Sequence, residues 1–123
     1  MRRNMEAILI CYEKCSTCKK AEKWLTEKGV PFTKRPIQAE NPTREEIIRW
    51  QGQSGVPMKK WFNTSGQRYR ELALKDQLDA MTDEEMAALL ATDGMLVKRP
   101  ILLSGSAVLV GFREEEWKKA LGM

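Results

Sequence analysis

The first 40 residues alternate between apolar and amphipathic segments in the order strand, helix, strand. Residues 7–12 read AILICY, a short and nearly continuous apolar run that is typical of a strand buried on both faces. Across residues 16–28 apolar side chains recur at helical spacing, and Gly29 is the expected helix stop. Residues 30–37, VPFTKRPI, predict a second strand. The short links predict a βαβ unit with parallel strands and a right-handed crossover.

The rest of the chain predicts helices followed by a hairpin. Residues 41–93 carry little strand signal, and the Thr-x-x-Glu sequences at Thr43 and Thr82 fit helix capping boxes. After this helical insert, the apolar runs RPILL and AVLVGF flank the loop SGS and predict an antiparallel hairpin. The segment REEEWKKAL predicts a last helix, acidic first and basic last, as the helix macrodipole favours. The expected fold class is α/β, with the helical insert between an N-terminal βαβ unit and a C-terminal ββα unit.

Composition sets limits on the kind of protein. With 123 residues and 42% hydrophobic residues the chain can bury one core, so residues 1–123 are expected to form a single domain. No apolar run approaches the roughly 20 residues of a membrane helix, and no leader is expected, so we predict a cytoplasmic protein. The net charge of +4 favours an anionic substrate or partner only weakly, because basic and acidic residues are interleaved, and no direct nucleic-acid binding is expected.

The sequence contains no histidine. This excludes catalysis by Ser/His/Asp or Cys/His groups, zinc sites that use histidine, and proton shuttling by imidazole. Any chemistry must therefore come from cysteine, arginine, lysine and carboxylate side chains.

The three cysteines, Cys11, Cys15 and Cys18, lie within eight residues at the spacing C-x3-C-x2-C. This spacing resembles the cluster loop of radical S-adenosylmethionine enzymes, but those enzymes need a partial barrel larger than this chain. A closed zinc site needs about four Cys or His ligands, and only three thiols are available. No metal is therefore expected, and thiol–disulfide exchange remains as the chemistry of the cysteines.

The inner pair, Cys15 and Cys18, lies where a buried strand leads into a helix. A helix N-terminus stabilises a thiolate, so Cys15 is expected to have a lowered pKa and to be the nucleophile. Cys18, one turn further on, is placed to resolve a mixed disulfide. The alternative is a pair of inert cysteines packed on the helix. Cys11, at the end of the strand, is interpreted as a small buried hydrophobic residue.

Two stretches, CYEKCSTCKKAEKWLTEKGV and LVKRPILLSGSAVLVGF, resemble the arsenate reductase (ArsC) family, including its Spx branch. The resemblance covers residues 7–121 and implies a thioredoxin-like fold, with its core at about 7–38 and 95–121 and a helical insert at about 41–93. It also implies that Cys15 is the nucleophile, that Arg99 binds an oxyanion and that Pro100 is the active-site proline, normally cis. The alternative for the Arg99–Pro100 pair is an ordinary entry into a strand.

The sequence departs from the single-cysteine arsenate reductases, which lack a cysteine at the position of Cys18 and take electrons from glutathione and glutaredoxin. Those enzymes have two further substrate arginines. The region of the first contains Lys59 and Lys60, and only Arg113 lies near the second. Lysine supplies charge without a bidentate fork, so Lys59 and Lys60 are candidate anion contacts, with a solvated surface role equally weighted.

The resemblance therefore implies a thiol–disulfide oxidoreductase, an arsenate reductase that uses Cys15 as nucleophile and Cys18 as resolving cysteine. It would have no bound cofactor and would act on a small anionic or disulfide substrate. Its electron donor would be a thiol reductant, either glutathione with glutaredoxin or thioredoxin. The first alternative is an Spx-like regulator that senses oxidation through its C-x2-C pair and binds RNA polymerase. The second is a relative in fold alone that reduces another small molecule or a protein disulfide.

Overall fold

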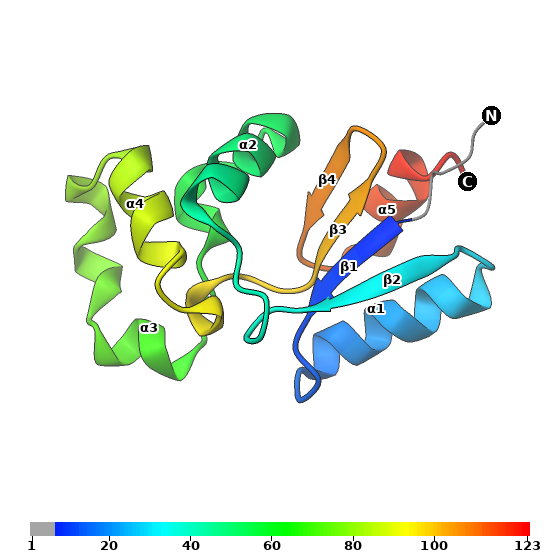
Figure 1. Cartoon of the computed structure of the whole chain (residues 1–123), viewed down its shortest axis with the longest axis horizontal. Helices are drawn as coiled ribbons and strands as arrows, with labels where there is room; N and C mark the ends of the chain where they lie inside the picture. Colours follow the sequence, from blue (N-terminus) through cyan, green and yellow to red (C-terminus); the bar gives the residue numbers. More distant parts are fainter. Residues whose placement is uncertain (1–6) are drawn as a thin grey trace. The chain divides into compact units, whose positions relative to one another are not determined.

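The computed structural model describes residues 7–123, which form two compact units (Figure 1). The first unit consists of residues 7–36 and 99–123, and the second of residues 37–98. The first unit contains a βαβ segment and a ββα segment, and the helices of the insert form the second. The expected α/β fold, thioredoxin-like with a helical insert between these segments, is confirmed.

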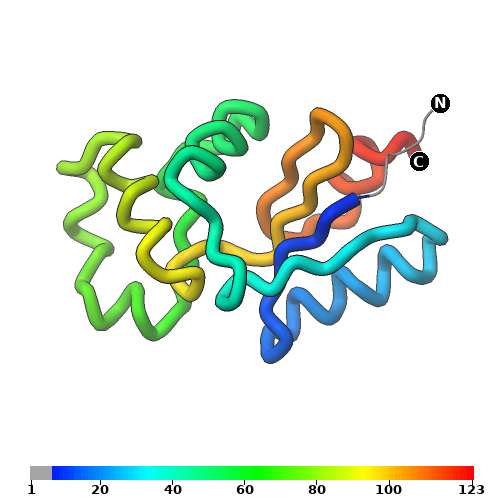
Figure 2. Tube along the Cα trace, viewed as in Figure 1, coloured from blue at the N-terminus to red at the C-terminus, as the bar shows by residue number. Residues whose placement is uncertain are grey.

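The first unit is built on a sheet that, among residues 7–123, has four strands in the order β2-β1-β3-β4. Strands β1 and β2 are parallel, whereas β3 is antiparallel to both β1 and β4. Figure 2 traces the chain from β2 through the second unit and back to β3, which pairs with β1. The strands are β1 (Ala7–Cys11), β2 (Phe32–Pro36), β3 (Ile101–Ser104) and β4 (Ala107–Val110), and the helices are α1 (Ser16–Glu27) and α5 (Glu114–Ala120).

The core of the first unit lies between the sheet and helices α1 and α5. Side chains alternate along β1, so that every second residue of this strand faces the helices. Trp24 of α1 and Trp117 of α5 meet edge to face with their ring centroids 6.1 Å apart. The buried cluster comprises Ala7, Leu9, Cys11, Cys18, Ala21, Trp24, Leu25, Leu102 and Trp117. This packing fixes α1, and with it both cysteines of the C-x2-C pair, against the end of β1.

The second unit consists of short helices joined by turns. Both expected capping boxes are present, at Thr43 and at Thr82, where each threonine and the glutamate three residues on exchange hydrogen bonds. Phe62 and Val97 form an isolated antiparallel bridge. The helices are α2 (Arg44–Ser54), α3 (Gln67–Glu71) and α4 (Asp83–Leu90), with 3-10 helices η1 (Met58–Trp61), η2 (Leu74–Asp76), η3 (Leu78–Ala80) and η4 (Gly94–Leu96).

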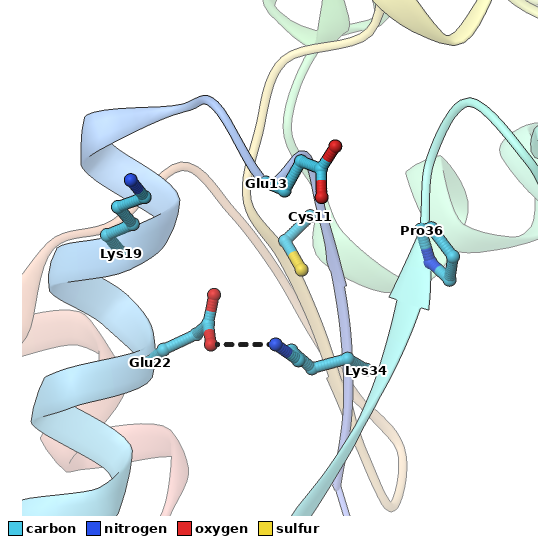
Figure 3. Close-up of a pocket in the computed structure, with 6 residues that line it drawn as sticks. All are labelled: Cys11, Glu13, Lys19, Glu22, Lys34 and Pro36. Atoms are coloured by element: carbon cyan, nitrogen blue, oxygen red, sulfur yellow. Dashed lines mark ion pairs between the residues drawn. The ribbon is translucent and has the colours of Figure 1, made fainter.

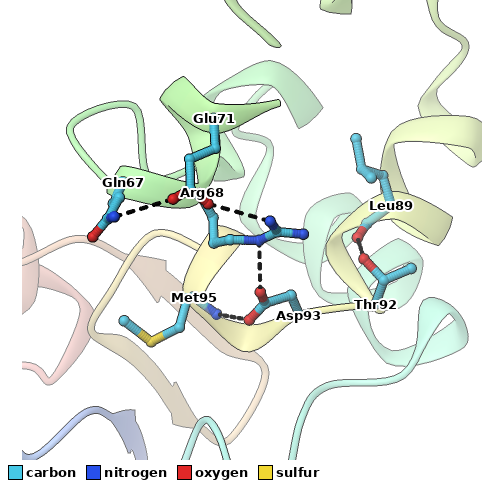
Figure 4. Close-up of polar contacts among 7 residues, drawn as sticks. All are labelled: Gln67, Arg68, Glu71, Leu89, Thr92, Asp93 and Met95. Atoms are coloured by element: carbon cyan, nitrogen blue, oxygen red, sulfur yellow. Dashed lines mark hydrogen bonds and ion pairs between the residues drawn. The ribbon is translucent and has the colours of Figure 1, made fainter. Parts of the chain in front are cut away.

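Polar contacts tie α3 to the turn that follows α4 (Figure 4). Arg68 pairs with Glu71 on its own helix and with Asp93, at 3.3 Å in each case. Asp93 in turn accepts a hydrogen bond from the backbone amide of Met95 at 2.9 Å. These groups are partly exposed, so the contacts order the surface of the second unit more than they stabilise it.

All four tryptophans, Trp24, Trp50, Trp61 and Trp117, are buried. Among the helices of residues 7–123, none has both the length and the apolar character needed to cross a bilayer.

Candidate active site

Cys15 is the N-cap residue of α1. Its backbone is extended, and its sulfur accepts a hydrogen bond from the backbone amide of Cys18 at 3.4 Å. The turn from β1 into α1 is closed by a hydrogen bond from the amide of Cys15 to the carbonyl oxygen of Tyr12 at 3.0 Å. The sulfur therefore lies where the unpaired amides of the first helical turn point.

The pKa of the Cys15 thiol is lowered. Burial acts against ionisation, but the amide and side chain of Cys18 and the hydrogen bond and positive charge of Arg99 together outweigh it. Cys15 is also only partly buried. A partly exposed thiol with a lowered pKa is ionised to a larger extent near neutral pH, which is what a nucleophile requires.

Cys18 has the opposite character. Its side chain is 0% exposed, and its sulfur accepts a hydrogen bond from the backbone amide of Tyr12 at 3.4 Å. Burial, with smaller contributions from the neighbouring thiols of Cys15 and Cys11, raises the pKa of Cys18 to about 12, against the effect of the Tyr12 amide. Cys18 is therefore protonated at neutral pH and is a weak nucleophile while Cys15 carries the negative charge beside it.

Arg99 and Pro100 precede β3, the strand that pairs with β1, and the peptide bond between them is cis. The Arg99 guanidinium carbon lies 5.3 Å from the centre of the Tyr12 ring, a cation–π arrangement that orients the side chain. Arg99 also donates a hydrogen bond to the Cys15 sulfur. The first unit thus brings Cys15, Cys18, Arg99 and Pro100 to one end of its sheet.

Tyr12 is the residue that the sequence did not single out. Its backbone holds both cysteines and its ring lies against Arg99. Nothing in the sequence marks it beyond its position between Cys11 and Cys15, because its ring contact with Arg99 depends on the pairing of β1 with β3.

The other cationic candidates have acidic partners or solvent around them. Lys59 and Lys60 are exposed residues of η1 in the second unit. Lys59 forms an ion pair with Asp79, which raises the pKa of the lysine. Arg113 is the N-cap residue of α5 in the first unit, and it pairs with Glu116 at 3.2 Å.

Cys11 is buried, as the sequence predicted, with 5% of its surface exposed. It lines a groove of about 420 Å³ between α1 and β2, whose other walls carry Glu13, Lys19, Glu22, Lys34 and Pro36 (Figure 3). Glu22 and Lys34 form an ion pair of 3.2 Å across it. The pKa of Cys11 is raised by burial and by Glu22, with Lys34 acting in the opposite direction.

Within residues 7–123, no three or more His, Cys, Asp or Glu side chains are grouped so that they could hold a metal ion.

Several known proteins are similar to this chain over most of its length. The protein YusI of Bacillus subtilis is 46% identical over 88% of this chain and 92% of its own length. The global transcriptional regulator Spx of Staphylococcus saprophyticus is 28% identical over 87% of this chain and 80% of its own length. A solved structure of an ArsC family related protein from Bacteroides fragilis has a TM-score of 0.91 and 52% identity, over 94% of this chain and 97% of that one. Residues 11–120 match the protein family described as "ArsC family", and the chain therefore belongs to the ArsC family.

Proposed function

We propose that this protein is a thiol–disulfide oxidoreductase in which Cys15 is the nucleophile and Cys18 the resolving cysteine. The observation that carries the proposal is the opposite tuning of two adjacent thiols: the pKa of Cys15 is lowered and the pKa of Cys18 is raised. Inert packed cysteines would both be expected to have raised values, because burial disfavours the thiolate. Membership of the ArsC family supports the same reaction class.

With a disulfide substrate the reaction has two exchange steps. The Cys15 thiolate attacks one substrate sulfur, forms a mixed disulfide and releases the other substrate sulfur as a thiolate. Bonding neutralises the charge on Cys15, which removes one of the effects that raise the pKa of Cys18. Cys18 then loses its proton and attacks the Cys15 sulfur, so that the Cys15–Cys18 disulfide forms and the second substrate thiolate leaves. The protein is oxidised by two electrons and the substrate is reduced by two.

With arsenate the same thiols would supply the two electrons. Cys15 attacks arsenic with loss of one oxygen as water, and Arg99 offsets the negative charge of the oxyanion. Attack of Cys18 on the Cys15 sulfur leaves the electron pair of the sulfur–arsenic bond on arsenic, which departs as arsenite. Of the two lysines of η1 that remain candidate anion contacts, Lys59 has its charge matched by Asp79 and Lys60 does not.

A dithiol reductant would reopen the Cys15–Cys18 disulfide. Because the oxidised protein would carry an internal disulfide, which accepts two electrons from a dithiol by thiol–disulfide exchange, thioredoxin is the favoured donor, with glutathione and glutaredoxin as the alternative. No bound cofactor takes part in these steps. The setting we propose is the cytoplasm, where such reductants keep thiols reduced.

A second candidate function is redox sensing by an Spx-like regulator that binds RNA polymerase. The 28% identity with Spx over most of both chains favours it. In that case the same Cys15–Cys18 disulfide would form on oxidation, and the reduced and oxidised proteins would differ in affinity for the polymerase and not in turnover.

The two functions are separated by a turnover assay. Reduced protein is incubated with arsenate or with a dithiol-reducible disulfide such as cystine, in the presence of thioredoxin, thioredoxin reductase and NADPH. Continuous NADPH consumption that is lost in Cys15→Ser supports the oxidoreductase, and consumption with arsenate identifies the substrate. No turnover with either substrate, together with retention of the protein on immobilised RNA polymerase, would replace the oxidoreductase with the regulator.

A further inference from the structure

The proposed reaction uses two of the three thiols and leaves Cys11 without a role. Cys11 and Cys18 belong to the same buried cluster, Cys11 from β1 and Cys18 from the facing helix α1. The amide nitrogen of Tyr12 is 3.4 Å from the Cys18 sulfur. This nitrogen is bonded to the carbonyl carbon of Cys11 and lies about 2.4 Å from the Cys11 Cα by standard bond lengths.

The Cys18 sulfur therefore lies within about 6 Å of the Cys11 Cα, because these two atoms cannot be further apart than the sum of 3.4 Å and about 2.4 Å. Both side chains belong to one buried cluster, and the Cys11 thiol contributes to the raised pKa of Cys18. Cys18 thus has a potential partner on either side, Cys15 on its own helix and Cys11 on the adjoining strand.

We propose that Cys11 completes a three-thiol relay: it attacks Cys18 in the Cys15–Cys18 disulfide, forms a Cys11–Cys18 disulfide and returns Cys15 as a thiolate. This inference rests on the proposed function, which supplies the first disulfide. One S–S bond breaks and another forms, so no electrons are gained or lost by the protein. The proton of Cys11 leaves to solvent through the groove that this side chain lines.

The direction of the exchange follows from the leaving group. A thiol with a low pKa leaves a disulfide faster and is the more stable free thiolate. Cys15 is that thiol, because the amide of Cys18 and the side chain of Arg99 stabilise its negative charge. The relay therefore leaves the disulfide between the buried residues Cys11 and Cys18, and it returns the partly exposed Cys15 to its thiolate form.

The charges that face Cys11 set the rate of its attack. In Figure 3 its sulfur lies among Lys19 and Glu22 of α1, Lys34 of β2 and Glu13 of the loop after β1. Burial and Glu22 raise the pKa of Cys11, so only a small fraction is thiolate near neutral pH. The thiolate fraction grows as pH rises, and the second disulfide should accordingly form faster in alkaline than in neutral buffer.

The experiment is a time course of disulfide mapping. Reduced protein is oxidised with one equivalent of diamide, quenched at intervals in acid, alkylated and digested with trypsin. Cleavage after Lys14 separates Cys11 from the peptide that holds both Cys15 and Cys18. A Cys15–Cys18 disulfide therefore closes a loop within one peptide, whereas a Cys11–Cys18 disulfide joins two peptides and leaves the alkyl group on Cys15.

In the wild type we expect the one-peptide loop first and the two-peptide product later, with Cys15 alkylated. In Cys11→Ala, and in Cys11→Ser if the alanine variant does not fold, the loop should persist and Cys15 should stay protected. A loop that also persists in the wild type would overturn the relay and leave the proposed function standing. Absence of any disulfide among the three cysteines would overturn the proposed function itself.

A second variant tests whether Cys11 is the attacking group. Glu22→Gln removes the negative charge that raises the pKa of Cys11, so conversion to the Cys11–Cys18 product should become several-fold faster at neutral pH. Glu27→Gln, an exposed change at the end of the same helix, is the matched control and should leave the rate unchanged. Equal rates in the wild type and Glu22→Gln would contradict attack by Cys11.

Discussion

At the scale of single residues, we expect the reactivity of Cys15 to depend on Arg99. Arg99 contributes a hydrogen bond and a positive charge that lower the pKa of Cys15. Arg99→Ala should raise that pKa and slow alkylation by iodoacetamide several-fold near pH 7, with little effect well above the thiol pKa. The pH profile of alkylation in the wild type and the variant measures this difference.

The control for this prediction is Arg113→Ala. Arg113 is exposed and pairs with Glu116, so its removal should leave the profile of Cys15 unchanged. Arg99→Lys should restore part of the effect, because it keeps the charge and loses the guanidinium fork. Superimposable profiles for the wild type and Arg99→Ala would mean that Arg99 does not stabilise the thiolate.

The sequence singled out Cys15, Cys18, Arg99 and Pro100 as candidates, the first pair from its position at a helix start and the second from a family resemblance. It could not identify Tyr12 or the groove beside Cys11. The groove depends on the parallel register of β1 and β2, which places Lys34 opposite Leu9 and lets it reach Glu22 on α1. The residues that form this groove have no regular spacing in the sequence, so no local sequence pattern predicts it.

At the scale of elements, Gly94 at the start of η4 is required by close packing. A Cβ at this position would lie 2.7 Å from the side-chain oxygen of Asn41 and still closer to the carbonyl oxygen of Ile37. Gly94→Ala should therefore destabilise the protein by about 1–3 kcal/mol, because backbone has to move. Urea unfolding followed by circular dichroism gives the difference in the free energy of unfolding.

Gly52→Ala is the matched control, since no atom lies within 4 Å of its added Cβ and the residue is inside α2. Alanine is the better helix former, so this change should stabilise the protein by about 0.5–1 kcal/mol. A Gly94→Ala variant as stable as the wild type would show that the segment from Ile37 to Asn41 can shift without lowering the free energy of unfolding.

The strands and the longer helices were predicted from local signals, whereas the short 3-10 helices of the second unit were not. Helices α1, α2 and α4 have apolar stripes or capping boxes, and both kinds of signal are local. Helices η1 to η4 are too short to show a period, and their positions depend on contacts such as the hydrogen bond from the amide of Lys98 to the carbonyl oxygen of Trp61. The second predicted strand, 30–37, is shorter in the structure because only Phe32–Pro36 pair with β1.

At the scale of the whole molecule, the buried Cys18 thiol couples stability to pH. Its pKa is about 12 in the folded protein and about 8.5 in an unfolded chain, so the folded state holds its proton more tightly. The stability that this difference contributes is fully present below the unfolded value and is lost as pH rises from there toward the folded value. Between pH 9 and pH 11 the wild type should lose more stability than Cys18→Ala, measured by urea unfolding of both reduced proteins. Parallel losses in the two proteins would mean that Cys18 ionises in the folded state as it does in the unfolded chain.

We also expect the two units to unfold together, as a single domain of this length would. The first unit is made from segments on either side of residues 37–98, joined by the pairing of β1 with β3. Opening the second unit alone would leave a long loop closed by that pairing, which costs about 4 kcal/mol of chain entropy relative to a free chain. Native-state hydrogen exchange tests this: the most protected amides of β1 and of α4 should have equal opening free energies, and Gly94→Ala should lower both equally. A loss confined to α4 would show instead that residues 37–98 unfold as a separate domain, because only a global opening transmits a change in the second unit to the strand pairing of the first.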